Sequence, residues 1–177
     1  LYFMTGIPTQ TADSVLGTAA AVEELYARVG NNPRLLPFIG PMAPFLDPGS
    51  MVYENPGHYG YTLRAHTLEE HRQLLTQPSW KYILNYIPDA MTIDEMVDST
   101  YEAAIGLNRV KLKVGAVDEK TATATERRVL EAQIAMARID TIMTHDEPAR
   151  GVLLTEFKRE IDALNESTVC EKSELNW

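Results

Sequence analysis

Cysteine is almost absent from this sequence of 177 residues, in which Cys170 is the only one. A single thiol cannot form an internal disulfide, and alone it cannot hold a zinc ion or an iron–sulfur cluster, which usually need three or four ligands. No apolar run approaches the roughly 20 residues that span a bilayer, and the N-terminus lacks the pattern of a secretory signal. We therefore expect a soluble, cytoplasmic protein.

Basic residues are also few. The chain has 25 acidic residues against 16 lysines and arginines, which gives a formal charge of -9. This balance repels phosphate backbones and anionic lipids unless the basic residues cluster, and they form only short groups. We expect no nucleic-acid and no membrane partner. A hydrophobic content of 45% is sufficient for a packed core.

Familiar catalytic patterns are missing as well. The sequence has no G-x-S-x-G, and Cys170 lies in a polar tail, so nothing indicates nucleophilic hydrolysis. The closest histidines, His66 and His71, are five residues apart, whereas two ligands on one helical face need a spacing of three or four. Glu69 and Glu70 have the pattern of helix-surface charge. We expect no metal ligands in this chain.

The first 39 residues predict a strand, a helix and a second strand. Residues 1–4 are apolar without polar alternation, which suits a strand covered on both faces. A helix is expected from Thr11 or Asp13 to about Val29, and residues 34–39 form the second apolar segment. This order is typical of a βαβ unit with parallel strands. Since the first strand needs neighbours, either a later strand pairs with it or the chain is the tail of a larger protein.

Proline and glycine dominate residues 40–60, which predicts a long loop, either functional or a stiff linker. Everything after it has a helical pattern, and the capping boxes Thr67-Leu-Glu-Glu70 and Thr92-Ile-Asp-Glu95 each begin a helix. The expected segments are helices at 67–76, 92–113, 118–144 and 146–164, an aromatic stretch at 80–87 and a polar tail from 165.

Two turns follow the predicted strands at their carboxyl ends. Ligands bind outside these ends in α/β units, so residues 5–10 and 40–50 should open onto one crevice. Gly6 would let the backbone approach a ligand, and Pro8 would stiffen the turn. The alternative is that GIPTQT only ends a strand and caps a helix.

These segments resemble a known family. FMTGIPTQT followed by a helix is similar to the G-[LI]-P-x-[EQ]-T turn after a late barrel strand in radical S-adenosylmethionine (radical SAM) enzymes. PFIGPMAPFLDPGS resembles the next strand and its loop in the subgroup with an N-terminal cobalamin-binding domain. The later HTLEEHRQLL, PSWKYILNY and MTIDEMVDSTYEAAIGLNRVK are similar to the helical C-terminal region of that subgroup. The similarity extends from Tyr2 to about Asp118.

The resemblance implies an α/β fold that turns mostly α, in which a short βαβ remnant of a radical SAM partial TIM-type barrel precedes a helical C-terminal region. The expected parts are barrel strands and their loop at 1–50, a connecting loop at 51–66, a helical domain at 67–165 and a polar tail at 166–177.

The family's cofactors are S-adenosylmethionine, a [4Fe-4S] cluster held by C-x-x-x-C-x-x-C, and in this subgroup cobalamin. The cluster cleaves S-adenosylmethionine to a carbon radical, and the commonest outcome is methyl transfer. This sequence contains no such cysteine motif and no room for a cobalamin-binding domain before Leu1. We therefore expect it to be the C-terminal portion of a longer enzyme, inactive alone, with the missing N-terminal barrel and cobalamin-binding portion as its partner.

The resemblance also implies site residues. The cofactor-binding positions, near the adenosyl group, are Gly6, Ile7, Pro8 and Gln10, of which the last closes the turn. The positions that shape the cofactor and substrate cavity are Pro41, Pro44, Asp47, Pro48, Gly49 and Ser50. The family usually has a second glycine where Tyr2 stands here. Further candidates to face the substrate, with helix packing as the alternative, are His66, Trp80, Lys81 and Tyr82.

Three hypotheses follow. The first is an enzyme fragment that lines the cavity for a small-molecule substrate and closes the barrel, which shields a radical from solvent. The second is a non-catalytic helical interaction module that retains barrel remnants. The third is that the free chain pairs its strand edges across a homodimer, since an uncovered strand edge is a template for association. We expect the isolated chain to be at least dimeric.

Overall fold

The computed structural model describes residues 1–41 and 45–165, and the chain forms two compact units, Leu1–Ile134 and Ala135–Trp177. The described residues are mostly helical, with four short strands in two sheets. The elements are β1 (Tyr2–Thr5), α1 (Ala12–Leu16), α2 (Thr18–Arg28), β2 (Phe38–Pro41), α3 (Met51–Glu54), the 3-10 helix η1 (Pro56–Tyr59), β3 (Tyr61–Leu63), α4 (Leu68–Leu75), α5 (Trp80–Ile83), β4 (Tyr86–Pro88), α6 (Ile93–Lys113), α7 (Glu119–Met143) and α8 (Glu147–Asn165). Within these ranges, no helix combines the length and the apolar character that crossing a membrane requires.

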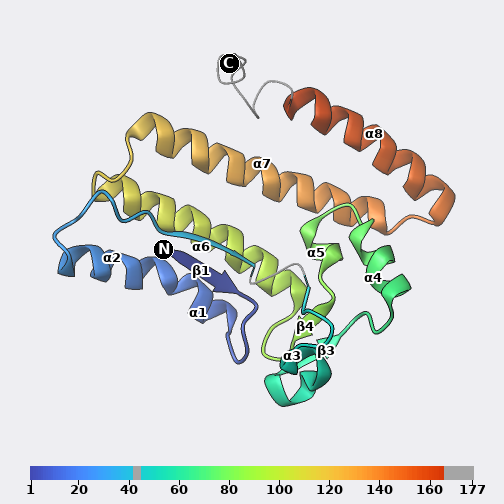
Figure 1. Ribbon diagram of the computed structural model, residues 1–177. Coiled ribbons are helices and arrows are strands. Elements are labelled where there is room, and N and C mark those ends of the chain that lie inside the picture. The colour runs from blue at the N-terminus through green and yellow to red at the C-terminus, as the bar shows by residue number, and fades with distance from the viewer. Residues whose placement is uncertain (42–44, 166–177) are drawn as a thin grey trace, which may run out of the picture. The chain divides into compact units, whose positions relative to one another are not determined.

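The predicted order of strand, helix and strand is present, and the strands are parallel. β1 pairs with β2 from Tyr2 opposite Phe38 to Thr5 opposite Pro41. Figure 1 shows β1 running beside α2 and α6. Because the strands are parallel, both carboxyl ends lie at the same edge of this sheet.

The second strand begins later than the sequence predicted. The backbone turns before it, where Leu35 N donates to Asn32 O at 3.0 Å, so residues 34–37 are not part of β2. At the amino end of the pair, the amino group of Leu1 donates to Leu36 O at 2.9 Å. The prediction of a second strand is therefore confirmed, but the strand covers Phe38–Pro41 and not residues 34–39.

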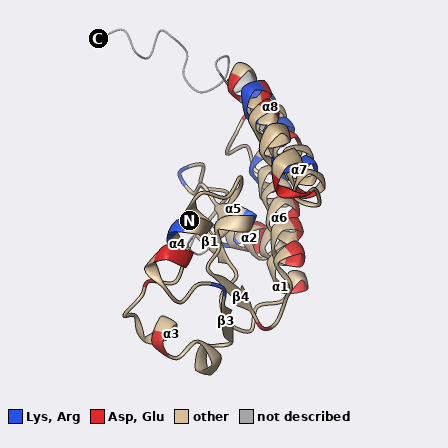
Figure 2. Ribbon diagram, turned by 90° about the vertical axis from the view of Figure 1, so that its right-hand side faces the viewer, with Lys and Arg blue, Asp and Glu red and all other residues tan. Residues whose placement is uncertain are grey.

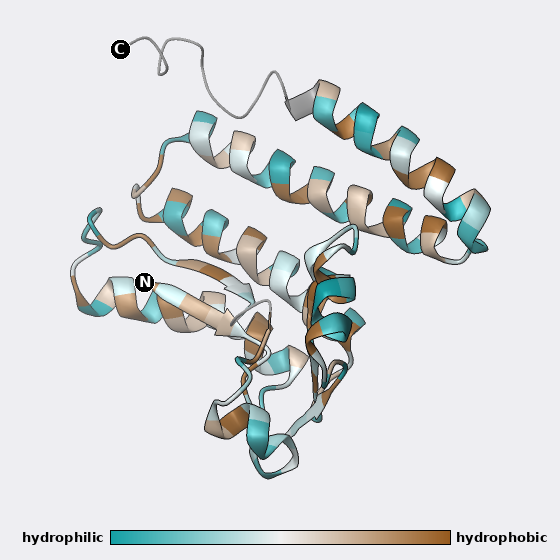
Figure 3. Cartoon of the chain, turned by 45° about the vertical axis from the view of Figure 1, so that its right-hand side comes forward, coloured by the Kyte–Doolittle hydropathy of each residue, from teal (hydrophilic) through white to brown (hydrophobic). Residues whose placement is uncertain are grey.

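One face of the β1–β2 sheet is covered and the other is exposed. Phe3 and Ile39 pack against a cluster from α2 and α6, whose members are Val22, Tyr26, Leu107 and Val110. The opposite face, here called the outer face, consists of Tyr2, Met4 and Phe38, which are 47%, 44% and 56% exposed. Figure 3 shows hydrophobic residues, in brown and tan, along part of each of these strands. In the described part of the chain, large apolar side chains on this face meet solvent.

The helix expected from residue 11 to 29 is interrupted at Gly17, which ends α1 and begins α2. Thr11 caps α1 as predicted, with its hydroxyl accepting from Ser14 N at 3.3 Å. After α2 the chain turns at Gly30, whose φ is +72°. The prediction of one continuous helix is wrong, and the break falls at the residue with the weakest helix propensity in the segment.

A second sheet forms where the sequence predicted only a loop and helices. β3 and β4 are antiparallel, with Tyr61 opposite Pro88. The loop at 40–60 contains α3 and η1, and Ser50 caps α3 by accepting from Tyr53 N at 3.2 Å. The predictions of an unstructured loop and of helices alone beyond it are therefore wrong. Three-residue strands are too short to display the alternation that identifies a strand.

The first unit packs around α6, which contacts α1, α2, α5 and β2. The predicted capping box begins this helix: the Thr92 hydroxyl accepts from Glu95 N at 3.1 Å, and the Glu95 carboxylate accepts from Thr92 N at 2.7 Å. The helix ends before Gly115, whose φ is +73°. The expected helix at 92–113 is confirmed, as is the capping box of α4 at Thr67.

The capping box of α6 should make the free energy of unfolding depend on pH in acid solution. Hydrogen bonds from the backbone and hydroxyl of Thr92 lower the pKa of Glu95. The stabilisation that ionised Glu95 contributes to the folded state is therefore fully present above the carboxyl pKa in the unfolded chain, about 4.3. It is lost as the pH falls through the lower pKa of Glu95 in the folded chain. Thr92→Ala should decrease the free energy of unfolding by about 1 kcal/mol at neutral pH. In urea titrations followed by circular dichroism, the difference between wild type and Glu95→Gln should disappear in acid. The same change at exposed Glu102 is the control, and a difference that persists in acid would contradict the expectation.

α7 begins after Asp118, whose side chain accepts from Thr121 N at 2.7 Å, as the sequence predicted. Its first part is joined to α6 by buried Asn108, whose side-chain amide donates to Ala122 O at 2.8 Å. This bond fixes the start of α7 in the first unit.

The second unit contains the C-terminal part of α7 together with α8, the helix predicted near Asp146. Arg138 donates from Nη2 to Glu160 Oε1 at 2.9 Å, and its guanidinium carbon lies 4.7 Å from the centre of the Phe157 ring. Phe157 is buried, as predicted. The side chain of Leu164 lies outside the description.

Lysines and arginines occur along the helices, many beside acidic residues (Figure 2). Ion pairs join Arg28 to Glu24 and Arg109 to Glu126. Strands β1, β3 and β4 carry no charged residue. The charge of the described residues is therefore carried mainly by helices, whereas the strands consist of apolar and neutral polar residues, with Arg64 and Asp89 directly after β3 and β4.

Candidate functional site

The candidate site lies at the edge where β1 and β2 end. Thr5 is opposite Pro41, so the turn that begins at Gly6 lies beside the carboxyl end of β2. Thr5 is fully buried, and its hydroxyl is hydrogen-bonded to that of Thr100 on α6 at 2.9 Å. The carboxyl end of β1 is thereby fixed to α6.

Gly6 is buried in a left-handed conformation, with φ +80°. Its amide donates to Gln10 Oε1 at 2.9 Å, and its carbonyl accepts from the Tyr61 hydroxyl at 2.9 Å. A Cβ atom here would be 2.6 Å from Met96 Sδ and 3.1 Å from the Tyr86 hydroxyl oxygen. The close approach that the sequence predicted for a ligand is made in this chain by Met96 and Tyr86.

Gln10 closes the turn with its side-chain amide. Its Oε1 also accepts from Ile7 N at 3.4 Å, and its Nε2 donates to Met4 O at 3.2 Å. Ile7 is half-buried and Pro8 is exposed. Of the four predicted cofactor-binding residues, Pro8 is thus the one whose side chain is most open to solvent.

Tyr2 reaches this edge across the outer face. Its hydroxyl donates to Pro41 O at 2.5 Å, and its ring centre lies 5.0 Å from that of Phe38. A Cβ atom on Gly40 would be 3.1 Å from the Tyr2 hydroxyl oxygen. Tyr2 therefore occupies space immediately beside the candidate site.

The loop after β2 supplies the other predicted positions. Pro41 is half-buried, and Ser50 caps α3. Pro44 lies outside the described residues. The positions exposed to solvent are Asp47, Pro48 and Gly49. The described part of this loop thus exposes one carboxylate, one proline and one glycine.

Asn85 holds this loop, and the sequence analysis did not identify it. Its Oδ1 accepts from Leu46 N at 2.6 Å, and its Nδ2 donates to Leu46 O at 2.9 Å. Its Nδ2 also lies 2.9 Å from His71 Nε2. The signal that could have found it is one amide inside the apolar segment YILNYIP, because a buried amide needs partners.

Burial shifts the pKa of two polar groups near the site. It raises the pKa of Tyr61 to about 12, and the protonated phenol donates to Gly6 O. Burial lowers the pKa of Arg64, whose Nη1 donates to Leu84 O at 2.9 Å. Both groups therefore act as donors to backbone carbonyls.

Three of the four further candidates, Trp80, Lys81 and Tyr82, contact other side chains of this chain. Trp80 Nε1 donates to the Tyr101 hydroxyl at 3.1 Å, and Lys81 Nζ lies 2.5 Å from Asp94 Oδ1. Both partners belong to α6, so α5 is attached to that helix. Tyr82 lies beside Lys81, with Nζ 5.6 Å from its ring centre. The side chain of His66 is exposed.

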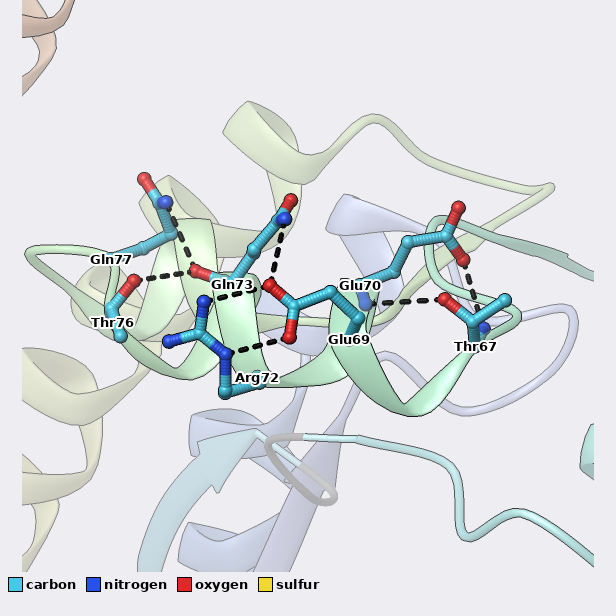
Figure 4. Close-up of polar contacts among 7 residues, drawn as sticks. All are labelled: Thr67, Glu69, Glu70, Arg72, Gln73, Thr76 and Gln77. Atoms are coloured by element: carbon cyan, nitrogen blue, oxygen red, sulfur yellow. Dashed lines mark hydrogen bonds and ion pairs between the residues drawn. The ribbon is translucent and has the colours of Figure 1, made fainter.

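Glu69 and Glu70 have separate structural roles on α4 (Figure 4). Glu69 binds Arg72 through two contacts of 2.7 Å, and this hydrogen bonding lowers the pKa of Glu69. Glu70 completes the capping box with Thr67, and hydrogen bonds from the backbone of His66 and Thr67 lower its pKa. These carboxylates belong to the helix surface, as predicted.

Potential metal ligands were sought throughout residues 1–41 and 45–165. In these ranges no three side chains of histidine, cysteine, aspartate or glutamate are grouped so that they could hold a metal ion. Cys170 and the predicted tail at 166–177 lie outside the description.

Comparisons of the chain with protein-family models, with curated proteins and with solved structures found no match.

Proposed function

We propose that this chain is the C-terminal part of a radical SAM enzyme of the subgroup that carries a cobalamin-binding domain. In this proposal, β1 and β2 are neighbouring strands of a partial barrel, α2 and α6 cover them from outside, and the later helices help to close the cavity. The substrate is a small molecule, and the reaction is methyl transfer or another radical reaction.

The half-covered parallel sheet is the observation that carries this proposal. Parallel sheets occur almost only with both faces covered, and independent sheets usually have three or more strands. β1 and β2 form a pair with one face on α2 and α6, whereas Tyr2, Met4 and Phe38 are exposed on the other. Further strands and a packed barrel interior would bury these side chains.

The turn at Gly6 and the loop after Pro41 would then lie at the mouth of the barrel, where barrel enzymes have their active sites. Ile7 and Pro8 would contact the adenosyl group of S-adenosylmethionine. Both peptide groups of Gly6 have partners in the chain, and Met96 and Tyr86 occupy the space beside its Cα, so Gly6 would act by positioning Ile7 and Pro8. The exposed residues at 47–49 would form part of the cavity wall.

The described residues do not fit an iron–sulfur cluster, because none of them forms a suitable group of ligands. In the proposal, the cluster and cobalamin therefore belong to another part of the enzyme. S-adenosylmethionine bound to such a cluster supplies the radical. The residues of this chain would bind its adenosyl side and exclude water from the cavity.

The test is to express the open reading frame that contains this segment, without oxygen, and to measure 5′-deoxyadenosine formed from S-adenosylmethionine and a reductant. We expect the product from the longer protein and none from the 177-residue chain. A longer protein that binds a cluster but forms no product would overturn the proposal. A reading frame without C-x-x-x-C-x-x-C would also overturn it and would favour the non-catalytic module.

The same preparation allows a structural readout through thiol labelling at Phe38→Cys in a Cys170→Ser background, with the label located by peptide mass spectrometry because the longer protein is expected to contain the cluster cysteines. The thiol should react in the 177-residue chain and be protected in the longer protein, because barrel strands would cover the outer face. Ala27→Cys, at an exposed position on α2, is the control and should react in both. Equal labelling at position 38 in both proteins would contradict the proposed barrel.

A further inference from the structure

Four residues connect the start of α4 to the loop after β2. Asn85 is 1% exposed and binds both backbone groups of Leu46, at 2.6 and 2.9 Å. His71 lies next to it, with Nε2 2.9 Å from Asn85 Nδ2 and Nδ1 2.8 Å from Thr67 O. We call Thr67, His71, Asn85 and Leu46 the Leu46 clamp.

These contacts determine the protonation of His71. Thr67 O can only accept, so His71 Nδ1 must carry a proton. The two bonds to Leu46 fix the orientation of the Asn85 amide, because its oxygen faces an N–H group and its nitrogen faces a carbonyl. The Asn85 nitrogen is therefore a donor toward His71, and Nε2 must be the acceptor. The clamp requires neutral His71 with its proton on Nδ1.

We propose that the Leu46 clamp is proton-sensitive: it holds the loop after β2 while His71 is neutral and releases Leu46 when His71 gains a second proton. Doubly protonated His71 presents N–H groups on both sides. The Nε2 proton would then face the Asn85 NH₂ group, so two donors would oppose each other at a part-buried contact.

Turning the Asn85 amide does not remove this conflict. In the turned orientation its oxygen could accept from protonated His71. Its nitrogen would then face Leu46 N, and the oxygen could no longer serve that amide, so both bonds to Leu46 would be lost. Either response to the proton breaks hydrogen bonds of buried groups, which are costly to leave unsatisfied.

The other groups near His71 are engaged elsewhere. From α3, the Tyr53 ring lies with its centre 5.8 Å from the His71 ring, and its hydroxyl donates to Ala65 O at 3.2 Å. On α4, the Glu70 carboxylate accepts from the backbone amides of His66 and Thr67.

Three further charged groups of this region, Glu69, Arg72 and Arg64, also have partners. Glu69 binds Arg72 on the surface of α4 (Figure 4). Arg64, next to β3, donates to Leu84 O, the residue before Asn85. Neither contact offers the acceptor that a second proton on His71 would need.

The proposal concerns the described residues of the loop and does not require the proposed enzyme. Leu46 is buried, whereas the next three residues are exposed, so the clamp is the point at which this part of the loop is attached.

The experiment is nuclear magnetic resonance of the 177-residue chain from about pH 7.5 to about pH 5. Long-range proton–nitrogen spectra should show the Nδ1–H tautomer of His71 at the higher pH. Hydrogen exchange of the Leu46 amide, corrected for its intrinsic pH dependence, should lose protection on the order of tenfold as His71 is protonated. The opposite tautomer, or protection independent of pH, would overturn the proposal.

Two variants separate His71 from the other histidines. His71→Gln should abolish the pH step in Leu46 exchange, whereas His66→Gln, at an exposed position five residues earlier, should retain it. A step that survives in His71→Gln would count against the clamp. If that variant does not fold, the wild-type tautomer and exchange measurements decide the question. All of these readouts are independent of 5′-deoxyadenosine formation.

Discussion

Replacing Gly6 with alanine should lower the free energy of unfolding by about 2 to 5 kcal/mol. Two costs add at this position. The φ of +80° costs an L-residue roughly 1–2 kcal/mol. The new Cβ atom would also lie 2.6 Å from Met96 Sδ, and overpacking of this kind costs about 1–3 kcal/mol. Urea titration at neutral pH measures the sum.

Gly30→Ala is the matched control. Gly30 has a similar φ of +72°, but a Cβ atom there would meet nothing within 4 Å. Its cost should therefore be the backbone cost alone. Combining Gly6→Ala with Met96→Ala tests the contact directly, because removal of the opposing sulfur should make the double variant less unstable than additivity predicts. Equal losses at the two glycines would show that the packing around Gly6 is not as described.

Replacing Asn85 with alanine should lower the free energy of unfolding by about 3 kcal/mol, since each buried group left without a partner costs about 1–3 kcal/mol. The groups affected are the amide and carbonyl of Leu46 and the Nε2 atom of His71. Urea titration measures the loss. The Leu46 amide should also exchange its hydrogen faster. A general loss of stability would instead speed up exchange throughout the chain.

Asn108→Ala supplies the comparison for Asn85. Asn108 is 2% exposed, and its side-chain amide donates to a single backbone group, Ala122 O. Its removal should cost less than the removal of Asn85, because fewer buried partners are left unsatisfied. If both variants lost the same free energy, the bonds to Leu46 would contribute nothing beyond ordinary packing.

The sequence was most informative where partners are local. The helix that begins at Thr92 could be predicted because Thr92 and Glu95, three residues apart, satisfy each other's backbone amides. β3 and β4 could not be predicted in the same way. Tyr61 pairs with Pro88, 27 residues later in the chain, and neither three-residue strand has a periodicity of its own.

The same distinction applies to the candidate site. Gly6 could be recognised because a glycine directly after an apolar segment indicates a special backbone conformation, and its φ of +80° agrees with that. What surrounds it could not be predicted, since Tyr61, Tyr86 and Met96 reach it from distant parts of the chain. Asn85 likewise depends on a partner 39 residues away.

The amino end of the β1–β2 pair has a practical consequence for protein engineering. The terminal nitrogen of Leu1 donates a hydrogen bond to Leu36 O. A backbone amide nitrogen at the same place could make that bond too. A fusion partner or affinity tag joined to Leu1 would leave the sheet at the edge opposite Gly6 and the loop after Pro41. Attachment there should therefore spare both turns.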